Sequence, residues 1–127
     1  MKLRVLIVDD TRTSQYLHRT LLEDQGYEVS VATTGEEALE KVEVFEPDLV
    51  LMDVVMPGID GIECCRRIRK LPNVEDLKIM MVTAATGYNR ISEAFTAGCD
   101  DYITKPIDEI ELLQKAKDLL KFVEIKK

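Results

Sequence analysis

Residues 49–60, with the sequence LVLMDVVMPGID, decide how the rest of the chain is interpreted. Four apolar residues precede a single carboxylate, Asp53, and the turn residues Pro57 and Gly58 follow it closely. A run without polar alternation is typical of a strand in the middle of a parallel sheet, where both faces are buried. A carboxylate at the end of such a strand is costly to bury without partners. We therefore predict that Asp53 has a chemical role.

Composition and charge exclude several classes of protein. The 127 residues suffice for one domain, and no apolar run approaches the roughly 20 residues that span a bilayer. A net charge of −7 gives no overall attraction to nucleic acid or to an anionic membrane, so we expect direct binding to neither. The apolar segment near the start is short and ends in two aspartates, unlike a signal peptide, so we expect a cytoplasmic protein. The odd number of cysteines indicates reduced thiols in the core.

Five apolar runs, each followed by an amphipathic segment, predict alternating strands and helices. The strands are expected at residues 3–8, 27–32, 48–53, 78–83 and 101–104. The helices are expected to begin near Thr11 or Thr13, Thr34, Asp60, Asn89 or Ser92, and Asp108. Strict alternation implies an α/β fold, a parallel sheet with helices on both faces, because the crossovers are right-handed.

The spacing of apolar residues also predicts which face of each helix is buried. For the first helix the predicted stripe is Tyr16, Leu17, Thr20, Leu21 and Asp24. For the last helix it is Ile110, Leu113, Ala116, Lys117 and Leu120, widened by Leu112 and Leu119. The only histidine, His18, lies on the first helix and is expected to be a surface or packing residue rather than a phosphate relay.

Polar side chains stand at the carboxyl ends of four predicted strands. They are Asp9 and Asp10 after the first strand, Asp53 at the third, Thr83 at the fourth and Lys105 after the fifth. These strand ends meet at one edge of a parallel sheet, where sites in such folds lie. Three carboxylates stay ionised together only with compensating positive charge. Lys105 supplies one unit, and Mg²⁺, which prefers carboxylate oxygens, would supply two. The sequence therefore predicts a magnesium site suited to phosphoryl chemistry.

Several short segments of the chain together resemble the motifs of a known protein family. They are residues 8–10 (VDD), 51–61 (LMDVVMPGIDG), 82–84 (VTA), 98–102 (GCDDY) and 103–106 (ITKP). In this order and spacing they resemble the receiver domain of two-component response regulators, in particular the single-domain chemotaxis type. The resemblance implies a doubly wound, flavodoxin-like (βα)5 fold with five parallel strands in the order 2-1-3-4-5. Residues 1–122 would form the receiver domain, and residues 123–127 a C-terminal tail or the stump of a linker.

The resemblance implies a phosphoacceptor and a metal site. Asp53 would accept a phosphoryl group from the phosphohistidine of a sensor histidine kinase or a phosphotransfer protein. Mg²⁺, with Mn²⁺ as a substitute, would be held by Asp9, Asp10, Asp53 and the backbone carbonyl of Val55. The chain would be a signalling module and not an enzyme, since it would catalyse only its own phosphorylation and dephosphorylation.

The resemblance also implies a switch that reports phosphorylation. Thr83 would turn its hydroxyl toward the phosphoryl oxygens, and Lys105 would pair with them. The peptide bond between Lys105 and Pro106 would be cis. Tyr102 would move inward together with Thr83. The altered surface would meet a downstream protein partner, an output domain beyond this chain, or a second copy in a phosphorylation-dependent dimer.

The chain departs from many receivers at two positions that tune the lifetime of the phosphoryl group. Val55 and Ala85 stand two residues beyond Asp53 and Thr83, and neither side chain can orient a water molecule. We therefore expect slow self-dephosphorylation.

Other interpretations of the same residues remain open at this stage. A metal-dependent phosphatase acting through an aspartyl phosphate would want a second acid where Val55 stands. A flavin- or nucleotide-binding domain would want a glycine- or hydroxyl-rich loop where the chain has Asp9 and Asp10. A degenerate receiver could serve as a scaffold only, although the intact acidic set argues against it.

Overall fold

The computed structural model describes residues 2–84 and 88–126, with residues 88, 89 and 124–126 described by their backbone alone. The strands are β1 (Arg4–Val8), β2 (Glu28–Ala32), β3 (Leu49–Asp53), β4 (Lys78–Thr83) and β5 (Asp101–Thr104). The helices are α1 (Arg12–Asp24), α2 (Gly35–Phe45), α3 (Gly61–Arg69), α4 (Tyr88–Ala97) and α5 (Glu109–Lys126). Among the described residues, no helix has the length and apolarity that a membrane span requires.

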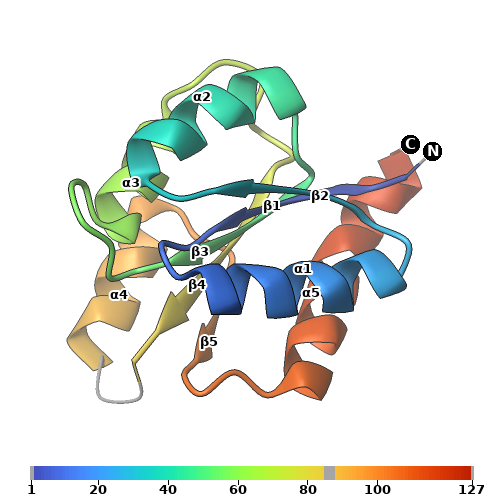
Figure 1. Cartoon of the computed structure of the whole chain (residues 1–127). Helices are drawn as coiled ribbons and strands as arrows, with labels where there is room; N and C mark the ends of the chain where they lie inside the picture. Colours follow the sequence, from blue (N-terminus) through green and yellow to red (C-terminus); the bar gives the residue numbers. More distant parts are fainter. Residues whose placement is uncertain (1, 85–87, 127) are drawn as a thin grey trace.

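The five strands form one parallel sheet in the order β2-β1-β3-β4-β5. Helices α1 and α5 cover one face, and α2, α3 and α4 cover the other (Figure 1). Each face has its own cluster of buried apolar side chains, so the central strands are buried on both sides. The predicted α/β doubly wound fold and its strand order are confirmed.

Most element boundaries lie within a residue or two of those expected from the sequence. The side chains of Thr34, Asp60 and Asp108 accept backbone N–H groups of the turns that follow, at 3.1, 2.9 and 2.9 Å. Such capping bonds explain why α2, α3 and α5 begin where they do. Helix α4 begins at Tyr88, slightly before the predicted Asn89 or Ser92.

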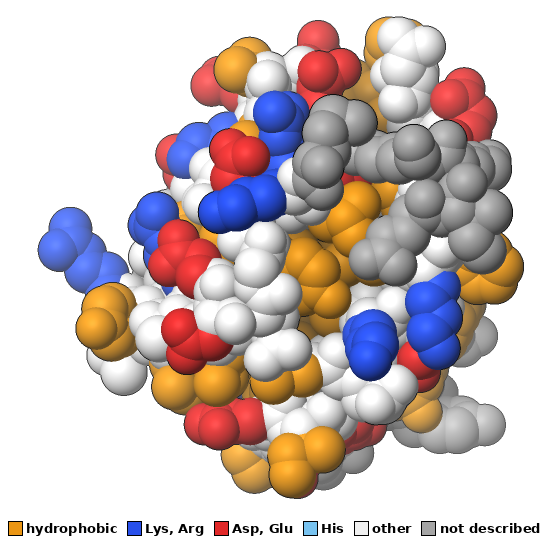
Figure 2. All heavy atoms as spheres, turned by 90° about the vertical axis from the view of Figure 1, so that its right-hand side faces the viewer, with side chains coloured by type: hydrophobic (Ala, Val, Ile, Leu, Met, Phe, Trp, Pro, Cys, Tyr) orange, Lys and Arg blue, Asp and Glu red, His pale blue; other side chains and the backbone are white. Residues whose placement is uncertain are grey.

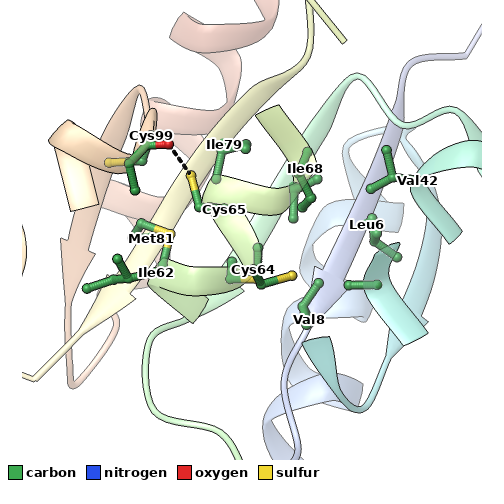
Figure 3. Packing of buried hydrophobic residues seen from close by; sticks show 14 of the residues in the cluster. Leu6, Val8, Val42, Ile62, Cys64, Cys65, Ile68, Ile79, Met81 and Cys99 are labelled. Carbon is green, nitrogen blue, oxygen red and sulfur yellow. Dashed lines mark hydrogen bonds between the residues drawn. The ribbon is translucent and has the colours of Figure 1, made fainter. Parts of the chain in front are cut away.

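The three cysteines belong to the core on the α3 side of the sheet. Cys64, Cys65 and Cys99 are all buried and free. Figure 3 shows them among aliphatic side chains, with the thiol of Cys65 directed at a backbone carbonyl, that of Ala97 at 3.6 Å. Burial raises the pKa of Cys64 and Cys99 to about 12 and that of Cys65 to about 11. These thiols therefore stay protonated and behave as small apolar residues.

The predicted buried stripe of α1 is wrong except at Leu21, which is partly buried and packs against the core. Tyr16 and Leu17 are 75% and 45% exposed, whereas His18 and Leu22 are buried. The buried face of α1 is the one that packs against β1, β2 and α5, where Leu22 joins the apolar cluster. His18 is thus a packing residue rather than a surface one.

The predicted stripe of α5 is partly wrong as well. Ile110 is 81% exposed, whereas Leu112, Ala116, Leu120 and Val123 form the buried face. Ile110 falls between Asp108, which caps the helix, and the first buried residue Leu112, so it stands on the outer side of the first turn. The helix continues through Lys126, and Val123 packs in the core beneath it.

The amino ends of the strands lie on the face where both termini are found. Figure 2 shows this face, with apolar side chains at the floor of a hollow and charged side chains around it. A cavity of about 630 Å³ at these strand ends is lined by residues that include Arg4, Asp48 and Leu77. The predicted site lies at the other end of the strands, which we call the carboxyl edge of the sheet.

Candidate functional site

The carboxyl edge brings the three predicted metal-binding aspartates together. Asp53 is the last residue of β3, and Asp9 and Asp10 directly follow β1, its neighbour in the sheet. One carboxylate oxygen from each of the three lies within 4.8 Å of the others. Asp9 and Asp53 are only 8% and 6% exposed, whereas Asp10 is exposed to solvent. The cluster is therefore an open-sided set of hard oxygen atoms.

Lys105 contributes the positive charge of this cluster. Its ammonium group donates a hydrogen bond to Asp53 Oδ2 at 3.0 Å. The backbone N–H of Lys105 donates to the carbonyl of Thr83 at 2.8 Å, which joins the ends of β4 and β5. The peptide bond between Lys105 and Pro106 is cis, the geometry that the resemblance implies. Since the lysine side chain is about half exposed, its ammonium can also meet an incoming group.

The electrostatics of Asp53 are unfavourable without further positive charge. Burial raises the pKa of its carboxyl group, and the hydrogen bond and charge of Lys105 oppose that rise. The negative charges of Asp9 and Asp10 raise it further. One ammonium faces three carboxylates, so the cluster carries a local excess of two negative charges when all are ionised.

The side chain of Thr83 is buried at the end of β4. The residue is 2% exposed, and its Oγ1 has no hydrogen-bond partner among the described residues. A buried hydroxyl that lacks a partner costs about 1–3 kcal/mol. Thr83 ends β4, next to the strand that carries Asp53. An acceptor atom arriving at this edge would relieve that cost.

Sequence reasoning missed two residues that hold the site in shape. The side-chain amide of Gln15, on α1, donates to the backbone carbonyl of Asp9 and fixes the turn after β1. Gly61 lies so close to β3 that an added Cβ would stand 2.1 Å from the carbonyl oxygen of Asp53. Its N–H donates to the carbonyl of Val54 at 2.8 Å. The glycine at the start of a predicted helix, directly after the capping Asp60, was the available signal.

The remaining predicted residues are Val55, Tyr102 and Ala85. Val55, in the loop after β3, is 73% exposed. Tyr102 is half-buried on β5, and its ring packs edge-on against Phe95 with centroids 6.0 Å apart. Lys115 holds Tyr102 by a 2.6 Å hydrogen bond to its carbonyl and by its ammonium group 5.1 Å from the ring centroid. Ala85 lies outside the described residues.

The raised pKa of Asp53 predicts a specific effect on stability. The folded state keeps the Asp53 proton to higher pH than the unfolded state does, so this group's contribution to stability falls as the pH rises through that window. In buffer without divalent metal, Asp53→Asn should therefore raise the free energy of unfolding at neutral pH by ~1 kcal/mol. Urea denaturation of both proteins at acidic and neutral pH would measure this.

A matched control for this prediction is Asp24→Asn, which removes an exposed carboxylate at the far end of α1. It should leave the difference between the two pH values close to that of the unaltered protein. A gain for Asp53→Asn that is the same in acid and at neutral pH would contradict the assignment to ionisation.

Comparison with known proteins places the chain in a family. Residues 5–117 match the model of the response regulator receiver domain. The response regulator PleD of Caulobacter vibrioides is 34% identical over 122 residues, which are 96% of this chain and 27% of PleD. The phosphate regulon transcriptional regulatory protein PhoB of Rhizobium meliloti is 36% identical over 118 residues, which are 93% of this chain and 52% of PhoB. The chain thus spans about half the length of these relatives or less.

Solved structures agree with this assignment. A CheY-like response regulator receiver domain protein from Methanospirillum hungatei superposes with a TM-score of 0.91 and 34% identity, covering 100% of both chains. The chemotaxis protein CheY4 of Vibrio cholerae gives a TM-score of 0.89 and 30% identity, covering 94% of this chain and 100% of CheY4. The predicted resemblance is confirmed, and the chain belongs to the response regulator receiver domain family.

Proposed function

We propose that Asp53 accepts a phosphoryl group from the phosphohistidine of a sensor histidine kinase or a phosphotransfer protein. The observation that carries the proposal is the cluster at the carboxyl edge, in which three carboxylates share one ammonium group. A phosphoryl-transfer site needs a nucleophile together with positive charge around the transferred oxygens. Of the two buried carboxylates in the cluster, Asp53 is the one to which Lys105 donates a hydrogen bond, so it is the candidate nucleophile.

The donor atoms of this cluster fit Mg²⁺. Carboxylate oxygens are the ligands that this ion prefers, and it uses few of them while keeping several water molecules. Asp9, Asp10, Asp53 and the carbonyl of Val55 would hold it, and Mn²⁺ would accept the same ligands. When bound, the ion would supply two positive charges that neutralise the local excess and attract phosphoryl oxygens.

The residues of the chain would then divide the work of the transfer. A carboxylate oxygen of Asp53 forms a bond to phosphorus while the bond from phosphorus to the histidine nitrogen breaks, and the electron pair leaves with the imidazole. The ammonium group of Lys105 pairs with the phosphoryl oxygens. The hydroxyl of Thr83, which is buried without a partner among the described residues, donates to one of them. The product is an acyl phosphate on Asp53.

A small phosphodonor tests this function without knowledge of the kinase. The protein is incubated with Mg²⁺ and acetyl phosphate, and its intact mass is then measured. We expect a gain of one phosphoryl group. We expect no gain when the metal is chelated before the phosphodonor is added. A mass that stays unchanged with several phosphodonors would overturn the proposal, and steady turnover of a phosphoester substrate would indicate a phosphatase instead.

We propose that Thr83 and Tyr102 report the state of Asp53 to the surface around β5. Thr83 pairs with Thr104 in the sheet, and Tyr102 lies two residues earlier on the same strand. An output domain beyond this chain, a separate protein partner or a second copy would bind the altered surface. Thr83→Ala should still be phosphorylated, but the NMR signals of Tyr102 should no longer shift on phosphorylation. Thr83→Ser, which keeps the hydroxyl, should retain most of the shift, and an undiminished shift in Thr83→Ala would contradict the switch.

The exposed side chain of Val55 predicts a long-lived phosphoryl group. It stands in the loop after the phosphoacceptor and offers no polar atom to orient an attacking water molecule. Val55→Asn should shorten the half-life of the phosphorylated protein by about tenfold, less than the roughly hundredfold or more of a positioned acid or base, because an amide orients a water molecule without taking its proton. Loss of the phosphoryl mass over time measures this, and Val44→Asn on the outer side of α2 is the control. A half-life of seconds in the unaltered protein would refute the prediction.

A further inference from the structure

A cavity of about 330 Å³ lies beside Asp53, between α1 and the segment that follows β5. Asp9, Asp53 and Lys105 form the charged part of its wall. Most of the remaining wall is apolar and consists of Ile7, Val8, Leu17, Leu51, Val82, Pro106 and Ile107. A cavity of this size, with apolar walls and a few convergent polar groups, is typical of a small-molecule site.

Helix α1 adds two polar side chains to this cavity. Ser14 and His18 stand four residues apart, one turn of helix, and both line the cavity. His18 is buried at 8% exposure on the apolar side of α1. Burial lowers the pKa of its imidazole, which is therefore neutral at neutral pH and offers one N–H donor and one acceptor. A neutral side chain that can donate a hydrogen bond thus lines the largely apolar part of the wall, next to the proposed phosphoacceptor.

The position of this cavity matters for any donor of the phosphoryl group. Transfer to Asp53 brings phosphorus to its carboxylate, and the rest of the donor must then occupy adjacent space. An apolar cavity of about 150 Å³ is large enough to bind benzene. The cavity beside Asp53 is about twice that volume, so a phenyl ring fits inside it.

We propose that this cavity receives the apolar part of a small phosphodonor, so that Asp53 is phosphorylated faster by aromatic acyl phosphates than by acetyl phosphate. The inference rests on the proposed function of Asp53. In the transfer, a carboxylate oxygen of Asp53 bonds to phosphorus, and the bond from phosphorus to the bridging oxygen of benzoyl phosphate breaks. The electron pair of that bond leaves with benzoate, so no proton transfer or redox partner is needed. The imidazole N–H of His18 is a donor for the departing carboxylate.

The test compares two donors on two proteins at saturating Mg²⁺. Initial rates of phosphorylation are measured by intact mass with benzoyl phosphate and with acetyl phosphate, for the unaltered chain and for Ser14→Leu, which fills the cavity from α1. For each protein the rate with benzoyl phosphate is divided by the rate with acetyl phosphate. Comparing this ratio between the two proteins cancels the difference in intrinsic reactivity between the donors. We expect the ratio of benzoyl to acetyl rates to fall by about tenfold in Ser14→Leu, the lower range for blocking an apolar subsite.

A control variant and a second measurement guard against a fold defect. Thr20→Leu places the same side chain on the exposed side of α1 and should keep the ratio of the unaltered chain. His18 is the only histidine, so its imidazole NMR signals report the cavity without any variant. Titration of the unaltered protein with benzoate should shift these signals saturably, and acetate at equal concentration should shift them much less.

The outcomes separate this inference from the function on which it rests. If both donors phosphorylate the protein and the ratio of benzoyl to acetyl rates is the same in the unaltered chain and in Ser14→Leu, the proposed role of the cavity is overturned. Asp53 then remains the proposed phosphoacceptor. If benzoate does not shift the NMR signals of His18, the proposed role of the cavity is overturned as well. Failure of both donors to phosphorylate the unaltered chain overturns the proposed function together with the inference.

Discussion

Asp53→Asn is expected to accept no phosphoryl group from acetyl phosphate under conditions that fully modify the unaltered chain. An amide has the shape of the carboxylate but lacks the anionic oxygen that attacks phosphorus, so the rate should fall by at least about a thousandfold, as for removal of a nucleophile. This substitution should leave the fold unchanged. Lys105 is about half exposed and can return to solvent when its partner is neutralised.

Intact mass after incubation with Mg²⁺ and acetyl phosphate is the measurement. Asp24→Asn, an exposed carboxylate at the far end of α1, is the control and should be modified as fully as the unaltered chain. A phosphoryl group on Asp53→Asn at the normal rate would mean that another residue is the acceptor. Asp10, the exposed member of the acidic cluster, would then be the next candidate.

The second large effect is expected for metal binding. Asp9→Asn combined with Asp10→Asn should weaken the binding of Mg²⁺ by at least about a hundredfold, because two of the proposed anionic ligands become neutral amides. Asparagine preserves shape at both positions, and its side-chain oxygen can still accept the backbone N–H of Thr11 as Asp9 does. The loss therefore reports charge at the site rather than a change of fold.

Calorimetric titration with Mg²⁺ measures this loss directly. A control of equal charge is Glu40→Gln combined with Glu43→Gln, which removes two carboxylates from the exposed side of α2. The control should bind Mg²⁺ as the unaltered chain does. Equal weakening in both double variants would show that the net charge of the protein, and not the cluster at the carboxyl edge, attracts the ion.

The α/β fold class and the charged members of the candidate site were predictable from local patterns, whereas the strand order came from the family resemblance. Strict alternation of strands and helices leaves few topologies, and parallel strands place their carboxyl ends together whatever the details of packing. Asp9, Asp53 and Lys105 could therefore be assigned to one edge from their positions alone. The capping residues Thr34 and Asp60 could also be predicted, because the side chain of a cap accepts a hydrogen bond from a backbone N–H only three residues further along the chain.

The details that failed depend on contacts between distant segments. The buried face of α1 is set by its packing against β1, β2 and α5, so spacing alone chose Tyr16 where the structure buries His18. The closeness of Gly61 to the carbonyl of Asp53 exists only once the loop folds back on β3. Neither contact leaves a periodic signal in the chain.

By itself, the sequence determined the order of strands and helices, the chemical types at the carboxyl edge and the charge imbalance among them. These depend on residue identity and on the direction of the chain, both of which are local. Only the tertiary structure decided that Lys105 meets Asp53 at 3.0 Å, that the hydroxyl of Thr83 is left without a partner among the described residues, and that His18 lines a cavity beside them. Those facts depend on how helices rotate and pack against the sheet, which is set by the whole core at once.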